Sequence, residues 1–244
     1  MTARVGLIIP SSNRMVEQEM ARFFPPGVTL HVARLRMTGP HHVPLDQLLP
    51  RIEEATRTLT DARCDVVAFH CTATSMEEGS AGEERVLAAV ARAGAPRATT
   101  TATAICRALD ALAARRIVLV TPYSAKTTAE EAEFLHAAGC EVLHAVGHAL
   151  AGSDAYCAAP PAFWRDSTLA AARREADAYL VSCANIAAMS VIDELEQRLE
   201  APVITSNQAV LWDALARIGH ADVSTCPGRL FAIGAEPARR SAAS

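Results

Sequence analysis

The chain has 244 residues, of which 50% are apolar and 20% are charged, so it can bury a large core. Its 23 basic and 27 acidic residues give a net charge of −4, which lacks the basic field that binding to nucleic acid or anionic membranes requires. No stretch approaches the roughly 18 uninterrupted apolar residues of a membrane span, and the N-terminus lacks a signal peptide's apolar core. We therefore expect a cytoplasmic protein with no nucleic-acid or membrane partner.

Short apolar runs alternate with longer amphipathic segments, a pattern typical of βα units and a mainly parallel sheet. Eight strands are predicted, in two sets of four, at 5–10, 29–35, 65–70 and 96–101, then at 116–122, 141–146, 178–182 and 202–206. Helices rich in alanine and leucine are predicted between them, at 14–23, 48–62, 81–93, 102–114, 125–138, 167–176, 189–199 and 208–218. The fold class is therefore α/β.

The two sets of elements match in spacing, which indicates an internal duplication. Pro10 and Pro122 each end the first strand of a set, and Cys71 and Cys183 each end the third; both pairs lie 112 residues apart. We therefore predict two pseudo-symmetric domains, each a four-stranded mainly parallel sheet flanked by helices. The cleft between such halves is a common place for a small-molecule site.

Cys71 and Cys183 are the candidate reactive residues. Each ends a strongly apolar run, and the carboxyl ends of parallel strands are where ligands bind in open α/β sheets. A thiol with a pKa near 8.5 needs local help to ionise at neutral pH, and the free amides of 72–75 and 184–185 are candidates to supply it. A single such cysteine is more often a buried apolar side chain, but the matched pair favours two thiols facing one substrate.

Asn13 and Tyr123 follow the first strand of each half. The amide of Asn13 either binds a carboxylate or enolate oxygen or caps the next helix, and the residue type fits both roles equally. Tyr123 either donates its hydroxyl to a carboxylate or packs. His70 precedes Cys71 on a strand, so its side chain points to the opposite face and is not expected to act as that cysteine's base.

Other motifs are absent or weak. His41 and His42 lie in a loop that either covers the site or is solvated. The cysteines show no CxxC or other metal-ligand spacing, and His144 and His148, four residues apart, fall on a strand and its following loop and not on one helix face, so no metal site is predicted. No P-loop, GxGxxG or GxSxG occurs, so no nucleotide site or serine nucleophile is predicted either. The remaining cysteines are expected to be reduced and structural: Cys64, Cys106, Cys140, Cys157 and Cys226.

The segments VGLIIPSSN (5–13), CTATS (71–75), VTPY (120–123) and PVITS (202–206) resemble the aspartate/glutamate racemase superfamily. The resemblance is to its branch of maleate cis-trans isomerases and arylmalonate decarboxylases, and runs from about Val5 to Phe231. It implies a cofactor-independent site between two α/β domains, here 1–100 with 208–244 and 101–207. It also implies a homodimer or larger homo-oligomer.

The resemblance implies a role for each matched residue. Cys71 would be the nucleophile and Cys183 the acid/base. The isomerases carry an asparagine near 153–156 that helps to bind the second carboxylate, and this chain has none there. Substrate-binding residues implied by the match are Ser12, Asn13, Thr72, Ala73, Tyr123 and Ala184.

These observations favour a cofactor-independent cis-trans isomerase of a small unsaturated dicarboxylate such as maleate. An amino-acid or hydroxy-acid racemase or epimerase that uses the same two thiols stays open. An arylmalonate-type decarboxylase is less favoured, because Cys71 stands where those enzymes have glycine. A non-catalytic carboxylate-binding module is the remaining alternative.

Overall fold

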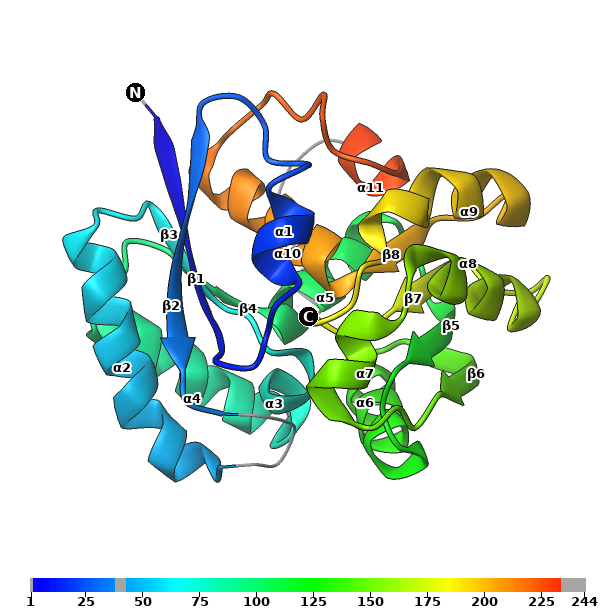
Figure 1. Cartoon of the computed structure of the whole chain (residues 1–244), viewed down its shortest axis with the longest axis horizontal. Helices are drawn as coiled ribbons and strands as arrows, with labels where there is room; N and C mark the ends of the chain where they lie inside the picture. The colour runs from blue at the N-terminus through cyan, green and yellow to red at the C-terminus, as the bar shows by residue number, and fades with distance from the viewer. Residues whose placement is uncertain (1, 38–42, 234–244) are drawn as a thin grey trace, which may run out of the picture.

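The computed structural model describes residues 2–37 and 43–233, which form two sheets side by side (Figure 1). The sheets have the same strand order, β2-β1-β3-β4 and β6-β5-β7-β8, and all neighbouring strands are parallel. The predicted pair of four-stranded sheets is therefore confirmed. The strands are β1 (Ala3–Pro10), β2 (Val28–Leu35), β3 (Val66–Phe69), β4 (Ala98–Thr100), β5 (Arg116–Thr121), β6 (Glu141–Gly147), β7 (Ala178–Val181) and β8 (Val203–Thr205).

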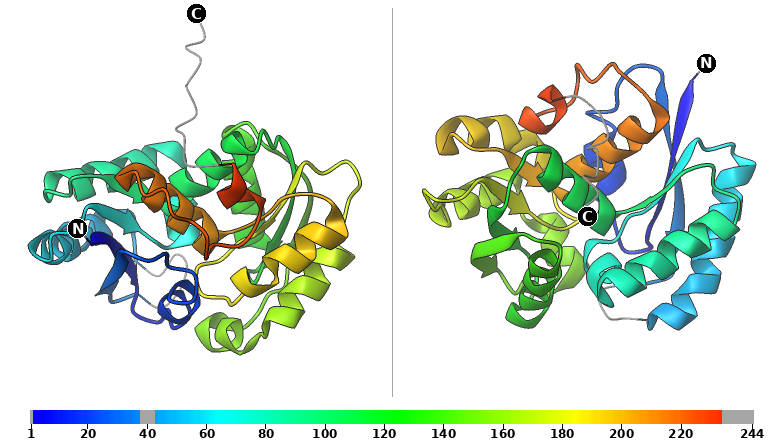
Figure 2. Two further views of the ribbon diagram at one scale, coloured as in Figure 1. Left: turned by 90° about the horizontal axis from the view of Figure 1, so that it is seen from above. Right: turned by 180° about the vertical axis from the view of Figure 1, so that it is seen from behind.

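Helices flank both sheets, as the views from above and behind show (Figure 2). Within the described residues, none of them combines the length and apolar character that crossing a bilayer requires. They are α1 (Val16–Met20), α2 (Leu45–Asp61), α3 (Thr72–Met76), α4 (Gly79–Arg92), α5 (Thr101–Ala111), α6 (Ala125–Ala137), α7 (Gly152–Ala158), α8 (Pro161–Ala170), the 3-10 helix η1 (Met189–Val191), α9 (Ile192–Leu199), α10 (Ser206–Ile218) and α11 (Arg229–Ala232).

Four helices differ most from the sequence prediction. Helices α3, α7 and α11 were not expected, because segments of five, seven and four residues are too short to show a helical period. Cys157, which falls outside all the predicted helices and strands, lies in α7. Helix α8 begins and ends earlier than predicted, since Pro161 occupies its first turn, where proline is favoured. The His41–His42 loop lies outside the described residues.

Helix α10 links the two halves (Figure 1). Its start is specified by sequence, because the Thr205 hydroxyl accepts from the Gln208 amide and the Gln208 side chain reaches back to Thr205. Its end is specified by Gly219, which has a left-handed φ of 69°. Between these limits α10 contacts β3, β4 and α1 of the first half, β8 of the second, and α5. The assignment of 208–244 to the first domain stays a prediction.

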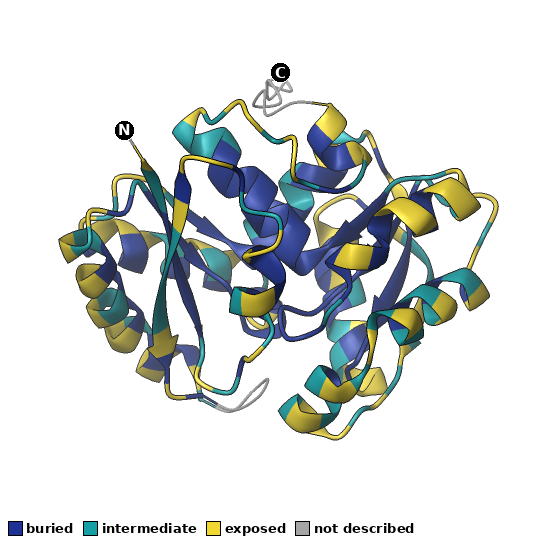
Figure 3. Ribbon diagram, turned by 45° about the horizontal axis from the view of Figure 1, so that its top comes forward, coloured by how far each residue is buried: buried dark blue, intermediate teal, exposed yellow. Residues whose placement is uncertain are grey.

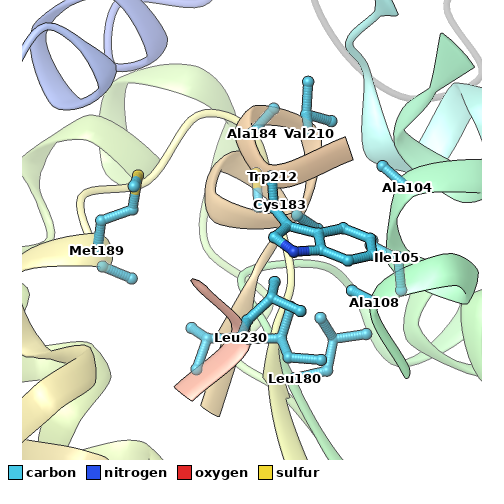
Figure 4. Packing of buried hydrophobic residues seen from close by; sticks show 14 of the residues in the cluster. Ala104, Ile105, Ala108, Leu180, Cys183, Ala184, Met189, Val210, Trp212 and Leu230 are labelled. Carbon is cyan, nitrogen blue, oxygen red and sulfur yellow. The ribbon is translucent and has the colours of Figure 1, made fainter. Parts of the chain in front are cut away.

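One hydrophobic core runs through both halves, and the inner strands β3, β7 and β8 and most of α10 are fully buried (Figure 3). Trp212 of α10 lies beside Ile105 and Ala108 of α5, with Leu230 of α11 next to it (Figure 4). Burying a large apolar side chain contributes roughly 2–3 kcal/mol, so this contact resists sliding of one half against the other. A second core fills the space between the first sheet and α2 and α4.

A buried polar chain crosses the same interface. The Glu19 carboxylate accepts from the Met189 amide at 2.7 Å and from the Asn207 side chain. Asn207 Oδ1 is 2.9 Å from His70 Nε2, and His70 Nδ1 is 3.0 Å from Thr101 Oγ1. Burial raises the pKa of Glu19 to about 7 and lowers the pKa of His70 to about 4, so His70 is neutral at physiological pH. The chain joins α1, α10, β3 and the segment before α9.

Glu19→Ala is expected to lower the free energy of unfolding by about 2–4 kcal/mol, because it leaves two buried donors without an acceptor. Glu17→Ala is the matched control on the same helix, where the carboxylate only pairs with Arg34 at the surface; its expected effect is below about 1 kcal/mol. Urea denaturation at pH 7 measures both. Equal effects of the two substitutions would contradict the role given to the buried chain.

Candidate active site

Cys71 and Cys183 line one cavity between the two halves. The cavity has a volume of about 50 Å³, and its walls come from the turns after β1, β3, β5 and β7, together with α7. Strand order reverses between β1 and β3 and again between β5 and β7, which is where ligands bind in such sheets. All eight predicted site residues line it: Ser12, Asn13, Cys71, Thr72, Ala73, Tyr123, Cys183 and Ala184.

Cys71 occupies the position just before the first residue of α3, with an extended backbone. Its Sγ lies 3.3 Å from the Thr74 hydroxyl, and the Thr74 amide also faces it. These donors favour the thiolate, but burial outweighs them, so the pKa of Cys71 is raised above its usual value. The amide that was predicted to favour the thiolate is therefore present, but its effect does not outweigh that of burial.

Cys183 has the equivalent place after β7. The Asn185 amide donates to its sulfur at 3.3 Å, and the Tyr123 hydroxyl also stabilises the thiolate. Burial is again the largest effect and raises the pKa of Cys183 to about 12, with a further contribution from nearby Cys71. Cys183 is thus a thiol at physiological pH, the form that can donate a proton.

Asn13 is held from both halves. Its Oδ1 accepts from the amides of Met15 and Val16 at the start of α1, and its Nδ2 donates to the Ala184 carbonyl at 3.1 Å. The helix-start role is therefore present in the structure. A side-chain amide carries two N–H groups, and among the described residues only one of those of Asn13 has a partner, so the other is available to a ligand in the cavity.

Two tyrosines form the wall beside Cys183. The rings of Tyr123 and Tyr156 meet edge to face with centroids 6.0 Å apart. Burial raises the pKa of Tyr123 well above its usual value and the pKa of Tyr156 to about 12, and both keep a neutral hydroxyl. Gly147 allows the backbone of Tyr123 to pack closely against β6. A Cβ at position 147 would lie 2.4 Å from Thr128 Oγ1 and 2.9 Å from the Tyr123 carbonyl oxygen.

Contacts at the cavity mouth also join the halves. Ser153 Oγ donates to Ser12 Oγ at 3.1 Å, and Arg14 pairs with Asp154 at 2.5 Å on the exposed surface. The Arg14 amide donates to Asn185 Oδ1 at 2.9 Å. Ser12 is therefore placed by α7 of the opposite half.

His70 lies as predicted, facing away from Cys71 and bonded to Thr101 and Asn207. Cys157 lies just behind the cavity wall, 3.2 Å from Asn185 Oδ1. In the described ranges, no three metal-ligating side chains come together.

Sequence reasoning did not assign four lining residues, namely Pro10, Ser153, Tyr156 and Asn185. Ser153 and Tyr156 reach the cavity because the segment after β6 forms α7. A glycine followed by Ser153 and Asp154, ahead of small helix-forming residues, was the available signal for a helix start.

The protein thus has two pseudo-symmetric α/β halves and a pair of thiols on one buried cavity between them. These features define a class of α/β proteins with a two-cysteine site. Residues 5–231 match the model of the arylmalonate decarboxylase family, and the chain belongs to that family. Among curated relatives, the maleate isomerase of Geobacillus stearothermophilus is 27% identical over 87% of this chain and 90% of its own length. The arylmalonate decarboxylase of Bordetella bronchiseptica is 28% identical over 94% of this chain and 97% of its own length.

Solved structures agree with this placement. The maleate isomerase of Pseudomonas putida S16 has a TM-score of 0.84 at 26% identity, over 96% of this chain and 99% of that one. A second match is a mutant of the Nocardia farcinica maleate cis-trans isomerase with a covalently bound succinylcysteine intermediate. Its TM-score is 0.84 at 25% identity, over 93% of this chain and 97% of that one. The sequence resemblance is therefore confirmed.

The raised thiol pKa values predict a pH dependence of alkylation. Below its pKa, a thiol gains about tenfold in thiolate fraction per pH unit. Iodoacetamide should therefore label Cys71 and Cys183 faster at each step from pH 7 to 9, and the labelling rates should not level off near pH 8.5. Peptide mass spectrometry at timed intervals measures both rates. A plateau near pH 7 would show that the cavity lowers the pKa of these thiols instead.

Proposed function

We propose that this protein is a cofactor-independent cis-trans isomerase of a small unsaturated dicarboxylate such as maleate. The observation that carries the proposal is the placement of two thiols, one from each half, on a single small buried cavity. The related maleate isomerases, one of them with a covalently bound succinylcysteine intermediate, support it.

In the proposed reaction Cys71 first loses its thiol proton to solvent, and the resulting thiolate adds to one alkene carbon and forms a C–S bond. The π electron pair moves to the neighbouring carbon, which takes a proton from Cys183. The former double bond is now a single bond and rotates. The Cys183 thiolate then removes the same proton, the double bond re-forms in the trans geometry, and the C–S bond breaks to release Cys71. A covalent intermediate thus replaces one difficult rotation with easier steps.

The cavity offers donors for the negative charge that develops on a substrate carboxylate. They are the free N–H of Asn13, the amides that follow the two cysteines, and the hydroxyl of Tyr123. Donors aimed at developing charge are often worth roughly 3 kcal/mol each. The neutral state of the two tyrosines suits this role, because an ionised phenol would repel a dicarboxylate.

A proton NMR screen of small mono- and dicarboxylates in deuterated buffer tests the reaction class. We expect maleate to be converted to fumarate. Exchange of an α-proton with inversion at a stereocentre, in an amino or hydroxy acid and without turnover of any alkene, would favour the racemase. Loss of CO₂ from an arylmalonate would favour the decarboxylase, and carboxylate binding without turnover would favour the binding module.

Cys71→Ala and Cys183→Ala are each expected to lower kcat/KM for maleate by at least about 1,000-fold, because each removes a group that makes or breaks a bond. Cys226→Ala is the matched control, since the Cys226 thiol donates to the Phe23 carbonyl and is not among the residues that line the cavity. Near-normal turnover by either cavity variant would rule out the two-thiol mechanism.

A cytoplasmic location and a homodimeric or larger assembly complete the proposal. The apolar excess of the sequence and the family resemblance support the assembly. Light scattering coupled to size-exclusion chromatography measures it directly.

A further inference from the structure

Glu131 of α6 is a buried carboxyl that the proposed reaction does not use. Its side chain is 2% exposed, and its Oε1 accepts a hydrogen bond from the Ser182 hydroxyl. Its Oε2 is buried and has no hydrogen-bond partner among the described residues. A buried carboxylate with a single neutral donor is poorly stabilised, so this position favours the protonated acid.

Three buried hydroxyls connect Glu131 to the cavity that holds the cysteines. Ser182, just before Cys183, lies 3.4 Å from the Ser206 hydroxyl at the start of α10. Thr72 Oγ1 lies 3.0 Å from Ser206 Oγ, and Thr72 lines the cavity next to Cys71. The row therefore runs from Glu131 through Ser182 and Ser206 to Thr72.

Each hydroxyl carries one proton and can donate only one hydrogen bond. The charge of Glu131 therefore decides which way the hydrogen bonds point along the whole row. A carboxylate can only accept, and then Ser182, Ser206 and Thr72 each donate toward Glu131. Thr72 offers only lone pairs to the cavity in that state. A neutral Glu131 can donate its proton to a hydrogen bond with Ser182. Ser182 then donates to Ser206 and Ser206 to Thr72, so the Thr72 proton is free to point into the cavity.

We propose that Glu131 is a positioning residue that, as a neutral acid, makes the Thr72 hydroxyl a donor to a substrate carboxylate, and withdraws that donor when it ionises. This inference rests on the proposed function, because it concerns the same carboxylate. It makes substrate affinity depend on pH through a group outside the cavity wall.

Burial puts the titration of Glu131 in the physiological range. It raises the pKa of this carboxyl to about 7. Glu77 at the end of α3 and Glu130 of α6 line the small space beside it, and Tyr123 and Cys183 face it from the cavity side. All four are neutral or negative, and no salt bridge reaches Glu131 within the described residues.

The equivalent glutamate of the first half shows the contrast. Glu19 lies 112 residues before Glu131, the same offset that separates the two cysteines. It is held by the Met189 amide and the Asn207 side-chain amide, two N–H donors that cannot reverse. Glu131 has instead one hydroxyl partner that can either donate or accept.

The test measures the Kd of succinate, a saturated dicarboxylate, by calorimetry from pH 6 to 9. For the wild type the Kd should rise about tenfold as Glu131 ionises, which matches the loss of one hydrogen bond to a charged group. Glu131→Gln should bind at every pH as the wild type does at pH 6. Glu133→Gln, an exposed position on the same helix, should keep the wild-type profile.

Ser182→Ala separates the hydroxyl row from simple charge repulsion, because it breaks the row and leaves Glu131 able to ionise. We expect its Kd to lose most of the pH dependence. The same rise in Kd in Ser182→Ala as in the wild type, or in Glu131→Gln as in the wild type, would overturn the proposal. Turnover of maleate by the wild type, measured in parallel, reports separately on the proposed function.

Discussion

The packing of α10 against the first half is the contact on which the site depends. This helix follows the last strand of the second sheet, yet it contacts β3, β4 and α1 of the first and packs against α5. Trp212 and the chain from Glu19 through Asn207 to His70 hold it there. Because α10 cannot move without opening a shared core, the ends of β3 and β7, and with them Cys71 and Cys183, stay on one cavity.

Burial gives this site its chemical character. It raises the pKa of both thiols, and the nearby amides and hydroxyls only partly offset that effect, so both sulfur atoms start protonated. Cys183 is then already in the form that it needs as the acid, whereas Cys71 must lose its proton before it adds to the alkene. In our proposal the buried Glu131 behind the cavity orients the Thr72 hydroxyl through a row of hydroxyls, without direct contact with substrate.

The sheets and the paired cysteines could be predicted from sequence, because apolar runs buried on both faces leave a clear pattern and the 112-residue offset recurs. Helices α3 and α7 could not, since they are too short for a period, and Tyr156 and Ser153 were missed with α7. The pKa directions depend on tertiary burial. Glu131 was not singled out, because its helix segment AKTTAEEAEFLHA resembles an ordinary solvated face; the available signal was its 112-residue offset from Glu19.

The most direct measurement is intact-protein and peptide mass spectrometry of Cys183→Ser incubated with maleate. With the acid/base thiol removed, the account predicts an adduct of one dicarboxylate on each chain, located on Cys71 and absent from Cys71→Ala in the same background. Efficient isomerisation by the wild type with no adduct on Cys71, under quenching fast enough to trap it, would contradict covalent addition by this thiol.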